Sequence, residues 1–279
     1  MQNITKHLTG VLKVSSLILP LCAMPAAAVF AIDGTSNSKE AAVKAPAFPP
    51  RKNAMADVDA MLAKASAKGK LGLIVMGGNW CHDSNALARR MSSPKLAPIL
   101  DANYESMLVD VAGLSDNMDI AKRFGRPVIY GTPTVLIIDP ATKQLVNAHD
   151  MHQWRDAESI SLEDTTAYFT KMVTAETREA PADDQLAPHY AAMMAEIDTF
   201  EKVQAGRIYN AFSIVGPMVM MKNKERPENF RDLWVELSKF RYQITKDLSS
   251  LKAEVRKFAA QDGHAELTFP SYEPFSWEK

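Results

Sequence analysis

The sequence predicts an α/β domain followed by an all-helical C-terminal region, and three observations support this. Between residues 54 and 178, apolar runs of strand length alternate with helical patterns, which is typical of a sheet covered by helices. From residue 185 to 262, every clear pattern is helical. The polar run at 176–185 (ETREAPADDQ) contains a proline and predicts a boundary between the two regions.

The first predicted elements lead to a cysteine. Residues 55–67 carry apolar side chains at steps of three or four, which predicts a helix. The wholly apolar run at 71–76 predicts a buried strand, and two glycines follow it. Cys81 then stands directly before a helical pattern. A thiol at a helix start faces unpaired backbone N–H groups and the positive end of the helix dipole. Both favour the thiolate, which is the reactive form.

The alternation continues beyond this helix. In chain order the pattern predicts a strand at 102–111, a short helix at 117–124, a strand at 133–138, an antiparallel return strand at 144–148, and a helix that Ser161 opens with Asp164 as its capping-box partner.

Three stretches resemble the thioredoxin superfamily. Residues 80–84 (WCHDS) resemble its Trp-Cys-x-x-Cys motif, with Ser84 in place of the second cysteine. Residues 131–138 (GTPTVLII) resemble its cis-proline strand, and residues 93–100 (SPKLAPIL) resemble the continuation of its active-site helix. The resemblance covers residues 50–176 and implies a thioredoxin-like fold there.

The same resemblance assigns roles to the site residues. Cys81 would be the nucleophile, His82 would add a positive charge beside the sulfur, and Ser84 would donate a hydrogen bond to it. Trp80 would pack at the rim, while Thr132 and Pro133 would shape the substrate groove, with Pro133 cis and against the sulfur.

The missing second cysteine changes the expected chemistry. Ser84 cannot resolve a mixed disulfide, so an outside thiol has to finish the cycle, either a small thiol such as glutathione or a client protein thiol. The superfamily usually has a buried carboxylate six residues before the nucleophile, and Val75 occupies that position here. The resemblance therefore implies monothiol exchange rather than efficient dithiol catalysis.

The first 31 residues predict a signal peptide. They contain Lys6 and Lys13, no acidic residue, a short apolar stretch, and small residues before cleavage after Ala28 or Ala31. We expect export, into the bacterial periplasm, followed by a linker at 32–53. Cleavage would also remove Cys22 and leave Cys81 as the only cysteine, which excludes an intramolecular disulfide.

Composition limits the partners. The net formal charge is −1, so we expect no nucleic-acid binding. No second apolar run has membrane-spanning length, so we expect no stable membrane association after cleavage. His149 and His152 have a spacing that could suit a metal, but we expect neither a metal site nor a cofactor.

The C-terminal region predicts a helical pair. Apolar residues recur over about four heptads in one long helix, which needs a partner: Phe230, Leu233, Leu237, Phe240, Ile244, Leu248, Leu251, Val255 and Phe258. The nearest partner is residues 186–203, with Pro217 and Pro227 punctuating the connection. Packing within one chain is favoured, and a homodimer through these helices is the alternative. Residues 263–279 are expected to form an irregular tail.

Two functions remain open on the sequence. The first is an exported, monothiol thioredoxin-like protein in thiol–disulfide exchange, a possible oxidoreductase of cell redox homeostasis. The second is a non-catalytic scaffold for binding or dimerisation, in which Cys81 is inert. A glutathione-transferase-like arrangement, with helices after a thioredoxin domain, has weaker support because no Glu-Ser pair follows Pro133 in the form that family uses.

Overall fold

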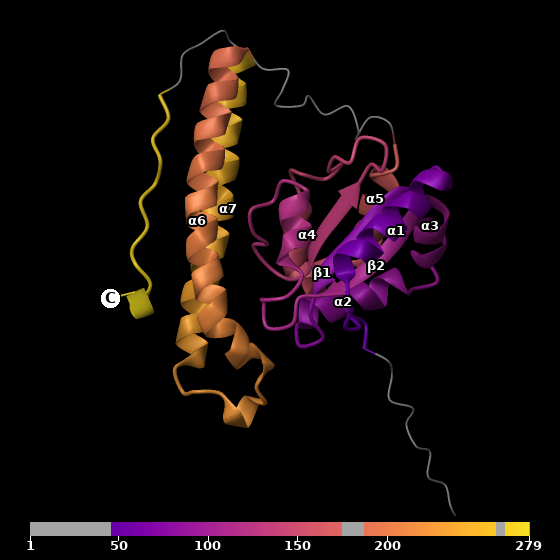
Figure 1. Cartoon of the computed structure of the whole chain (residues 1–279), viewed down its shortest axis with the longest axis horizontal. Coiled ribbons are helices and arrows are strands. Elements are labelled where there is room, and N and C mark those ends of the chain that lie inside the picture. Colours follow the sequence, from indigo (N-terminus) through magenta and orange to yellow (C-terminus); the bar gives the residue numbers. More distant parts are fainter. Residues whose placement is uncertain (1–45, 175–186, 261–265, 279) are drawn as a thin grey trace, which may run out of the picture. The chain divides into compact units, whose positions relative to one another are not determined.

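In the computed structural model, a small mixed sheet flanked by helices precedes two long helices (Figure 1). The structure describes residues 46–174, 187–260 and 266–278. The predicted signal peptide, the linker up to residue 45 and the predicted boundary at 176–185 lie outside the described residues. Residues 44–279 group into one compact unit. Among the described residues, no helix combines the length and apolar character that a membrane span needs.

The sheet has the strand order β2-β1-β3 in the described chain. The central strand β1 (Leu71–Gly77) is buried throughout, as its apolar sequence predicts. It pairs in parallel with β2 (Tyr104–Asp110) and antiparallel with β3 (Thr134–Ile138). Because strand side chains alternate between faces, Leu73 and Val75 enter one apolar cluster while Ile74 and Met76 enter another.

The predicted helices around the sheet are present. They are α1 (Ala54–Ala67), α2 (His82–Met91), α4 (Met118–Arg123) and α5 (Leu162–Lys171). A short helix that was not predicted separately, α3 (Ala97–Asn103), follows α2, and a 3-10 segment, η1 (Met151–Ser159), precedes α5. The capping box that opens α5 is confirmed, since the Ser161 hydroxyl accepts from the Asp164 backbone N–H at 3.0 Å.

Residues 93–100 do not simply continue the active-site helix. α2 ends at Met91, and α3 begins at Ala97 after a turn. Pro94 cannot donate a helical hydrogen bond and crowds the preceding turn, whereas Pro98 falls in the first turn of α3, where proline is tolerated.

The predicted return strand at 144–148 is also wrong in part. Only an isolated bridge between Ile138 and Leu145 forms there. Beyond this bridge, the buried side chain of Asn147 makes the hydrogen bonds to β3 that the backbone of a return strand would make. Its amide oxygen accepts from the Ile137 N–H at 2.9 Å, and its amide nitrogen donates to the Val135 carbonyl at 2.9 Å.

The helical pair consists of α6 (Pro188–Met220) and α7 (Phe230–Ala260), which run side by side (Figure 1). Lys252 reaches Asp198, and the Tyr190 hydroxyl donates to the Phe258 carbonyl, so the helices are antiparallel. The apolar stripe of α7 is buried at its centre, with Ile244 fully buried, as predicted for packing within one chain.

The end of α6 differs from the prediction. The helix does not stop before Pro217 but continues through it to Met220. Pro217 has no N–H to donate to the carbonyl four residues earlier, so the helix loses one hydrogen bond there and ends within the next turn. The predicted partner segment at 186–203 is therefore the first half of a longer helix.

The described part of the tail, residues 266–278, is irregular except for the short segment η5 (Ser276–Glu278). Phe275 is buried and packs edge-on against Phe240 of α7.

Candidate functional site

The antiparallel pairing of β1 and β3 brings Cys81 to Thr132. Met76 lies opposite Thr134, so the end of β1 and the start of β3 meet at one edge of the sheet. Cys81 follows β1 as the N-cap residue of α2, and its Sγ donates to the Thr132 carbonyl at 3.2 Å. The Thr132–Pro133 peptide bond is cis, as the sequence resemblance implied.

The sulfur does not face the helix N–H groups, contrary to the sequence expectation. Cys81 makes no side-chain capping hydrogen bond to α2, because its Sγ is directed to Thr132 instead. Asn85 stabilises the turn between β1 and α2 that carries Cys81. Its side-chain amide donates to the carbonyls of Asn79 and Cys81 at 2.8 and 2.9 Å. The thiol is 8% exposed.

Ser84 is placed differently from its predicted role. Its side chain is fully buried, and its hydroxyl accepts from the Gly78 N–H at 3.3 Å. A Cβ on Gly77 would lie 2.7 Å from this oxygen, so the turn after β1 is packed tightly around Ser84. In the described chain the hydroxyl therefore supports the turn rather than binding the Cys81 sulfur.

His82 points away from the sulfur. Its side chain is 78% exposed, and its Nε2 lies 3.2 Å from the carboxylate of Asp83. The other Asp83 oxygen accepts from the Glu158 N–H at 2.9 Å, which ties α2 to the end of η1. The predicted modulator is thus held by a carboxylate on the solvent side of the helix start.

Trp80 packs as a rim residue, as predicted, but its neighbour comes from the helical pair. Its indole N–H donates to the Ala112 carbonyl at 2.7 Å. Its ring meets Trp234 of α7 edge-on, with ring centroids 6.1 Å apart. The helical pair therefore takes part in the surroundings of Cys81.

Cys81 and Thr132 line a cavity of about 670 Å³. Its walls come from the start of α2, from η1, and from the first half of α7, which contributes Trp234, Ser238 and Tyr242. A thiol that opens into a cavity of this size can meet a peptide or small-molecule disulfide.

Residues 53–140 match a family model described as thioredoxin-like. These residues form a thioredoxin-like domain. A solved disulphide isomerase from Xylella fastidiosa Temecula1 is 22% identical, with a TM-score of 0.42, and the alignment covers 46% of this chain and 98% of that one. No curated protein sequence matches this chain.

Two arginines near this site were not predicted from the sequence. Arg155, from η1, lies over the ring of Tyr242, 3.5 Å from its centroid, and donates to the Thr245 hydroxyl at 3.1 Å. Arg241, from α7, is 6% exposed and donates to the Ser238 hydroxyl at 3.1 Å. Arg241 lies on the same 3–4 repeat as Leu237 and Ile244, and a charged residue at an apolar repeat position was the available signal.

Tyr242 and Asp156 complete this group. The Tyr242 hydroxyl donates to the Asp156 carboxylate, and burial, together with that carboxylate, raises the pKa of Tyr242 to about 12. Burial lowers the pKa of Arg155, against the opposing effects of Tyr242 and Asp156. Tyr242 is therefore a neutral donor at physiological pH.

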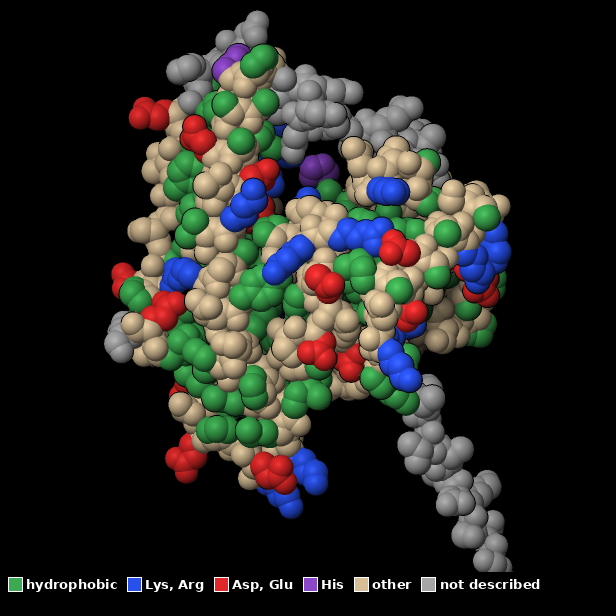
Figure 2. Space-filling model, viewed as in Figure 1, with side chains coloured by type: hydrophobic (Ala, Val, Ile, Leu, Met, Phe, Trp, Pro, Cys, Tyr) green, Lys and Arg blue, Asp and Glu red, His purple; other side chains and the backbone are tan. Residues whose placement is uncertain are grey.

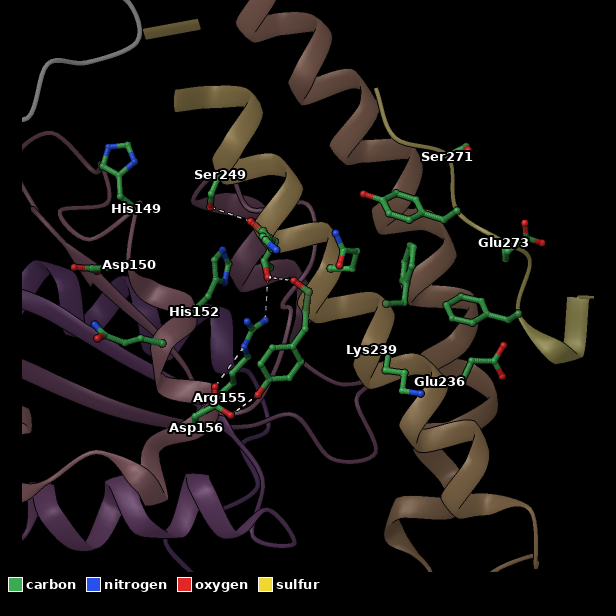
Figure 3. Close-up of a pocket in the computed structure, with 18 of the residues that line it drawn as sticks. His149, Asp150, His152, Arg155, Asp156, Glu236, Lys239, Ser249, Ser271 and Glu273 are labelled. Atoms are coloured by element: carbon green, nitrogen blue, oxygen red, sulfur yellow. Dashed lines mark hydrogen bonds and ion pairs between the residues drawn. The ribbon is translucent and has the colours of Figure 1, made fainter. Parts of the chain in front are cut away.

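A larger cavity of about 1030 Å³ lies beyond this group, between η1, α7 and the tail (Figure 3). Arg155, Asp156 and Tyr242 line both cavities, so they form the wall between them. On the face shown in Figure 2, basic and acidic side chains are interspersed.

The two histidines considered for a metal lie on the wall of this larger cavity. His152 packs edge-on against Tyr130, with ring centroids 5.0 Å apart, and burial lowers its pKa to about 3. Figure 3 shows His152 near α7 and His149 further out. The described residues contain no group of three or more His, Cys, Asp or Glu arranged to hold a metal ion.

Proposed function

We propose that this chain is an exported thioredoxin-like protein in which Cys81 carries out monothiol disulfide exchange with client thiols or small thiols such as glutathione. The observation that carries the proposal is the placement of Cys81. It stands at the start of α2, bonded to the carbonyl beside the cis-proline, and lines a cavity large enough for a substrate. The resolving position holds a buried serine.

The chemistry balances without a second cysteine in the chain. The Cys81 thiolate attacks one sulfur of a disulfide, a bond forms between these sulfurs, and the other substrate sulfur leaves as a thiolate. An outside thiolate then attacks the substrate sulfur of the mixed disulfide. The Cys81 thiolate leaves, and the substrate is released as a disulfide with the outside thiol.

Oxidised glutathione is a direct probe of the first step. We expect the chain without residues 1–31, and therefore without Cys22, to gain one glutathionyl group on Cys81, detected by intact mass and peptide mapping, and to lose it on addition of reduced glutathione. The Cys81→Ser variant should gain none. A wild-type protein that is folded and remains unmodified would contradict the proposal.

One observation favours the second candidate, a non-catalytic scaffold. Cys81 is 8% exposed, and Trp234 of α7 contacts the tryptophan beside it. If Cys81 is inert, alkylation of the native protein should be as slow as unfolding allows and should accelerate only in denaturant. Alkylation of the native protein that is independent of its unfolding rate supports disulfide exchange instead.

Export rests on the composition of residues 1–31, with their small residues before Ala28 and Ala31. The expected mature protein begins after one of these alanines and is found in the periplasmic fraction of bacterial cells. N-terminal sequencing of the fractionated protein checks both points. A homodimer through the C-terminal helices stays a prediction, and light scattering on the purified protein tests it.

A further inference from the structure

Arg241 is a buried cation without an acidic partner in the described part of the chain. Its side chain takes part in no ion pair there, and its Nε has no hydrogen-bond partner. The guanidinium lies between two aromatic rings, 5.1 Å from the centroid of Trp234 and 5.7 Å from that of Phe212. Burying an uncompensated charge is costly, so a buried arginine on the apolar side of α7 points to a use for the charge.

The contacts of Arg241 lead to the Cys81 cavity. Its hydrogen-bond acceptor, Ser238, and its stacking partner, Trp234, both line that cavity together with Cys81. Trp234 in turn packs on Trp80, the residue before Cys81. Trp234, Ser238 and Arg241 thus follow one another at steps of about one helical turn along α7. This spacing places the Arg241 guanidinium behind the part of the cavity wall that faces the Cys81 sulfur.

The pKa of Arg241 agrees with this placement. Burial and, to a smaller extent, the neighbouring Arg155 lower it to about 10, against the opposing effects of Tyr242 and Cys81. Arg241 therefore remains charged at neutral pH.

The other charged groups around the sulfur are engaged elsewhere. Asp83 binds His82 and the Glu158 backbone, Asp156 binds Tyr242 and Arg155, and Glu158 pairs with Arg89. Arg226 donates to the carbonyls of Met218 and Val219 at the end of α6. These are the charged groups of α2, η1 and the α6–α7 connection that line the cavity.

We infer that Arg241 of α7 is a positioning residue of the thiol site, and that its charge stabilises the anionic Cys81 sulfur during disulfide exchange. The inference rests on the proposed function of Cys81. In the first step Arg241 favours the attacking thiolate. In the second step it favours the same thiolate as the leaving group when an outside thiol opens the mixed disulfide.

The test compares two substitutions at the same position in the full chain. Arg241→Gln keeps a donor for Ser238 but removes the charge, whereas Arg241→Lys keeps the charge. The matched control is Lys246→Met, which removes an exposed cation from the same helix. The measurement is the rate of Cys81 alkylation by iodoacetamide as a function of pH, followed by mass spectrometry, with circular dichroism to verify folding.

We expect Arg241→Gln to react about tenfold more slowly at neutral pH and to shift its pH profile upward. Arg241→Lys should react faster than Arg241→Gln at neutral pH, since it retains the charge, although lysine cannot stack between the two rings as arginine does. Lys246→Met should match the wild type. A folded Arg241→Gln protein with the wild-type pH profile would overturn the inference. A merely structural role would slow the reaction without moving the profile.

A second measurement needs only the wild type, in case Arg241→Gln does not fold. The ratio of the Cys81 alkylation rates with anionic iodoacetate and neutral iodoacetamide should exceed the ratio for a free small thiol, because the uncompensated cation attracts the anion. A ratio at or below that of the free thiol refutes the inference. Failure of glutathionylation in the wild type would instead refute the proposed function, because alkylation is measured independently of it.

Discussion

The approach of α6 to the loop after β2 gives a sharp prediction. At Gly216 a Cβ atom would lie 1.7 Å from the carbonyl oxygen of Gly113. In Gly216→Ala the two segments would have to separate by roughly 2 Å to reach an ordinary contact distance. The atom in the way belongs to the backbone, so rotation of a side chain cannot relieve the overlap.

The size of the effect follows from two opposing terms. Overpacking of a tight contact costs about 1–3 kcal/mol, and backbone against backbone falls at the upper end of that range. Alanine gains roughly 0.5–1 kcal/mol over glycine within a helix. We therefore expect Gly216→Ala to lose about 1–2 kcal/mol of unfolding free energy, measured by urea denaturation followed by circular dichroism.

The chain offers a matched control in the same helix. Gly206 is exposed and a Cβ there would meet nothing within 4 Å, so Gly206→Ala should be stabilised by up to about 1 kcal/mol. Gly113 follows Ala112, which accepts the hydrogen bond of Trp80. Loosening of this contact should therefore also raise the alkylation rate of Cys81. If Gly216→Ala is as stable as Gly206→Ala, α6 does not approach Gly113 in solution and the reasoning is wrong.

Three further predictions concern the site and the cores. Ser84→Cys should form an internal disulfide with Cys81 on oxidation and gain insulin reduction, because both positions share the first turn of α2; a variant that stays fully reduced would show that the two positions do not meet. Ile244→Asp should cost several kcal/mol, since an unpaired charge would enter a fully buried position, and thermal melts that match the wild type would mean that the stripe is exposed. Burial holds the pKa of His152 near 3, below its ordinary 6.5. As the pH falls, the His152 side chain is therefore protonated in the unfolded chain at a higher pH than in the folded protein. The contribution of His152 to the free energy of unfolding should therefore be fully present above about pH 6.5 and be lost as the pH drops toward 3. Urea titrations at a series of pH values should show a smaller loss of stability for His152→Phe than for the wild type. An equal dependence of stability on pH in the two proteins would mean that His152 is protonated in the folded protein.

The parts of the fold that depend on local patterns could be predicted from the sequence. The run at 71–76 is apolar at every residue, and the capping box of Ser161 and Asp164 satisfies its own helix end. The helical pattern after Cys81 predicted its position at a helix start, and motif resemblance predicted that it lies beside the cis Thr132–Pro133 bond. Each of these features is decided within a few residues or by a recognisable motif.

The errors arose where a side chain or a distant backbone decides the outcome. Asn147 replaces strand backbone with its amide, which strand periodicity cannot show. Pro217 suggested a helix end, yet α6 continues through it to Met220 at the cost of one backbone hydrogen bond. The orientation of the Ser84 hydroxyl depends on the Gly78 N–H, and motif resemblance carries no information about that hydrogen bond.

The contribution of the helical pair to the site was beyond the sequence pattern for a different reason. Arg241 is separated from Cys81 by most of the chain, and nothing in either local sequence indicates that the two lie near one another. Between Leu237 and Ile244, both Phe240 and Arg241 fit a step of three or four along α7, and both are buried. A strict count of that repeat would have marked the arginine as buried, although not what it faces.

The amide of Asn147 has a consequence for how the protein behaves in a crowded compartment. β3 is an outer strand of the sheet, and an outer strand with unpaired N–H and C=O groups is a template on which another polypeptide can add. Asn147 occupies one N–H and one C=O of β3, at Ile137 and Val135, and the Val146 N–H occupies the Ile137 carbonyl. An incoming strand would have to displace a buried amide before it could pair there, so this short side chain protects the thioredoxin-like domain against self-association at its own sheet edge.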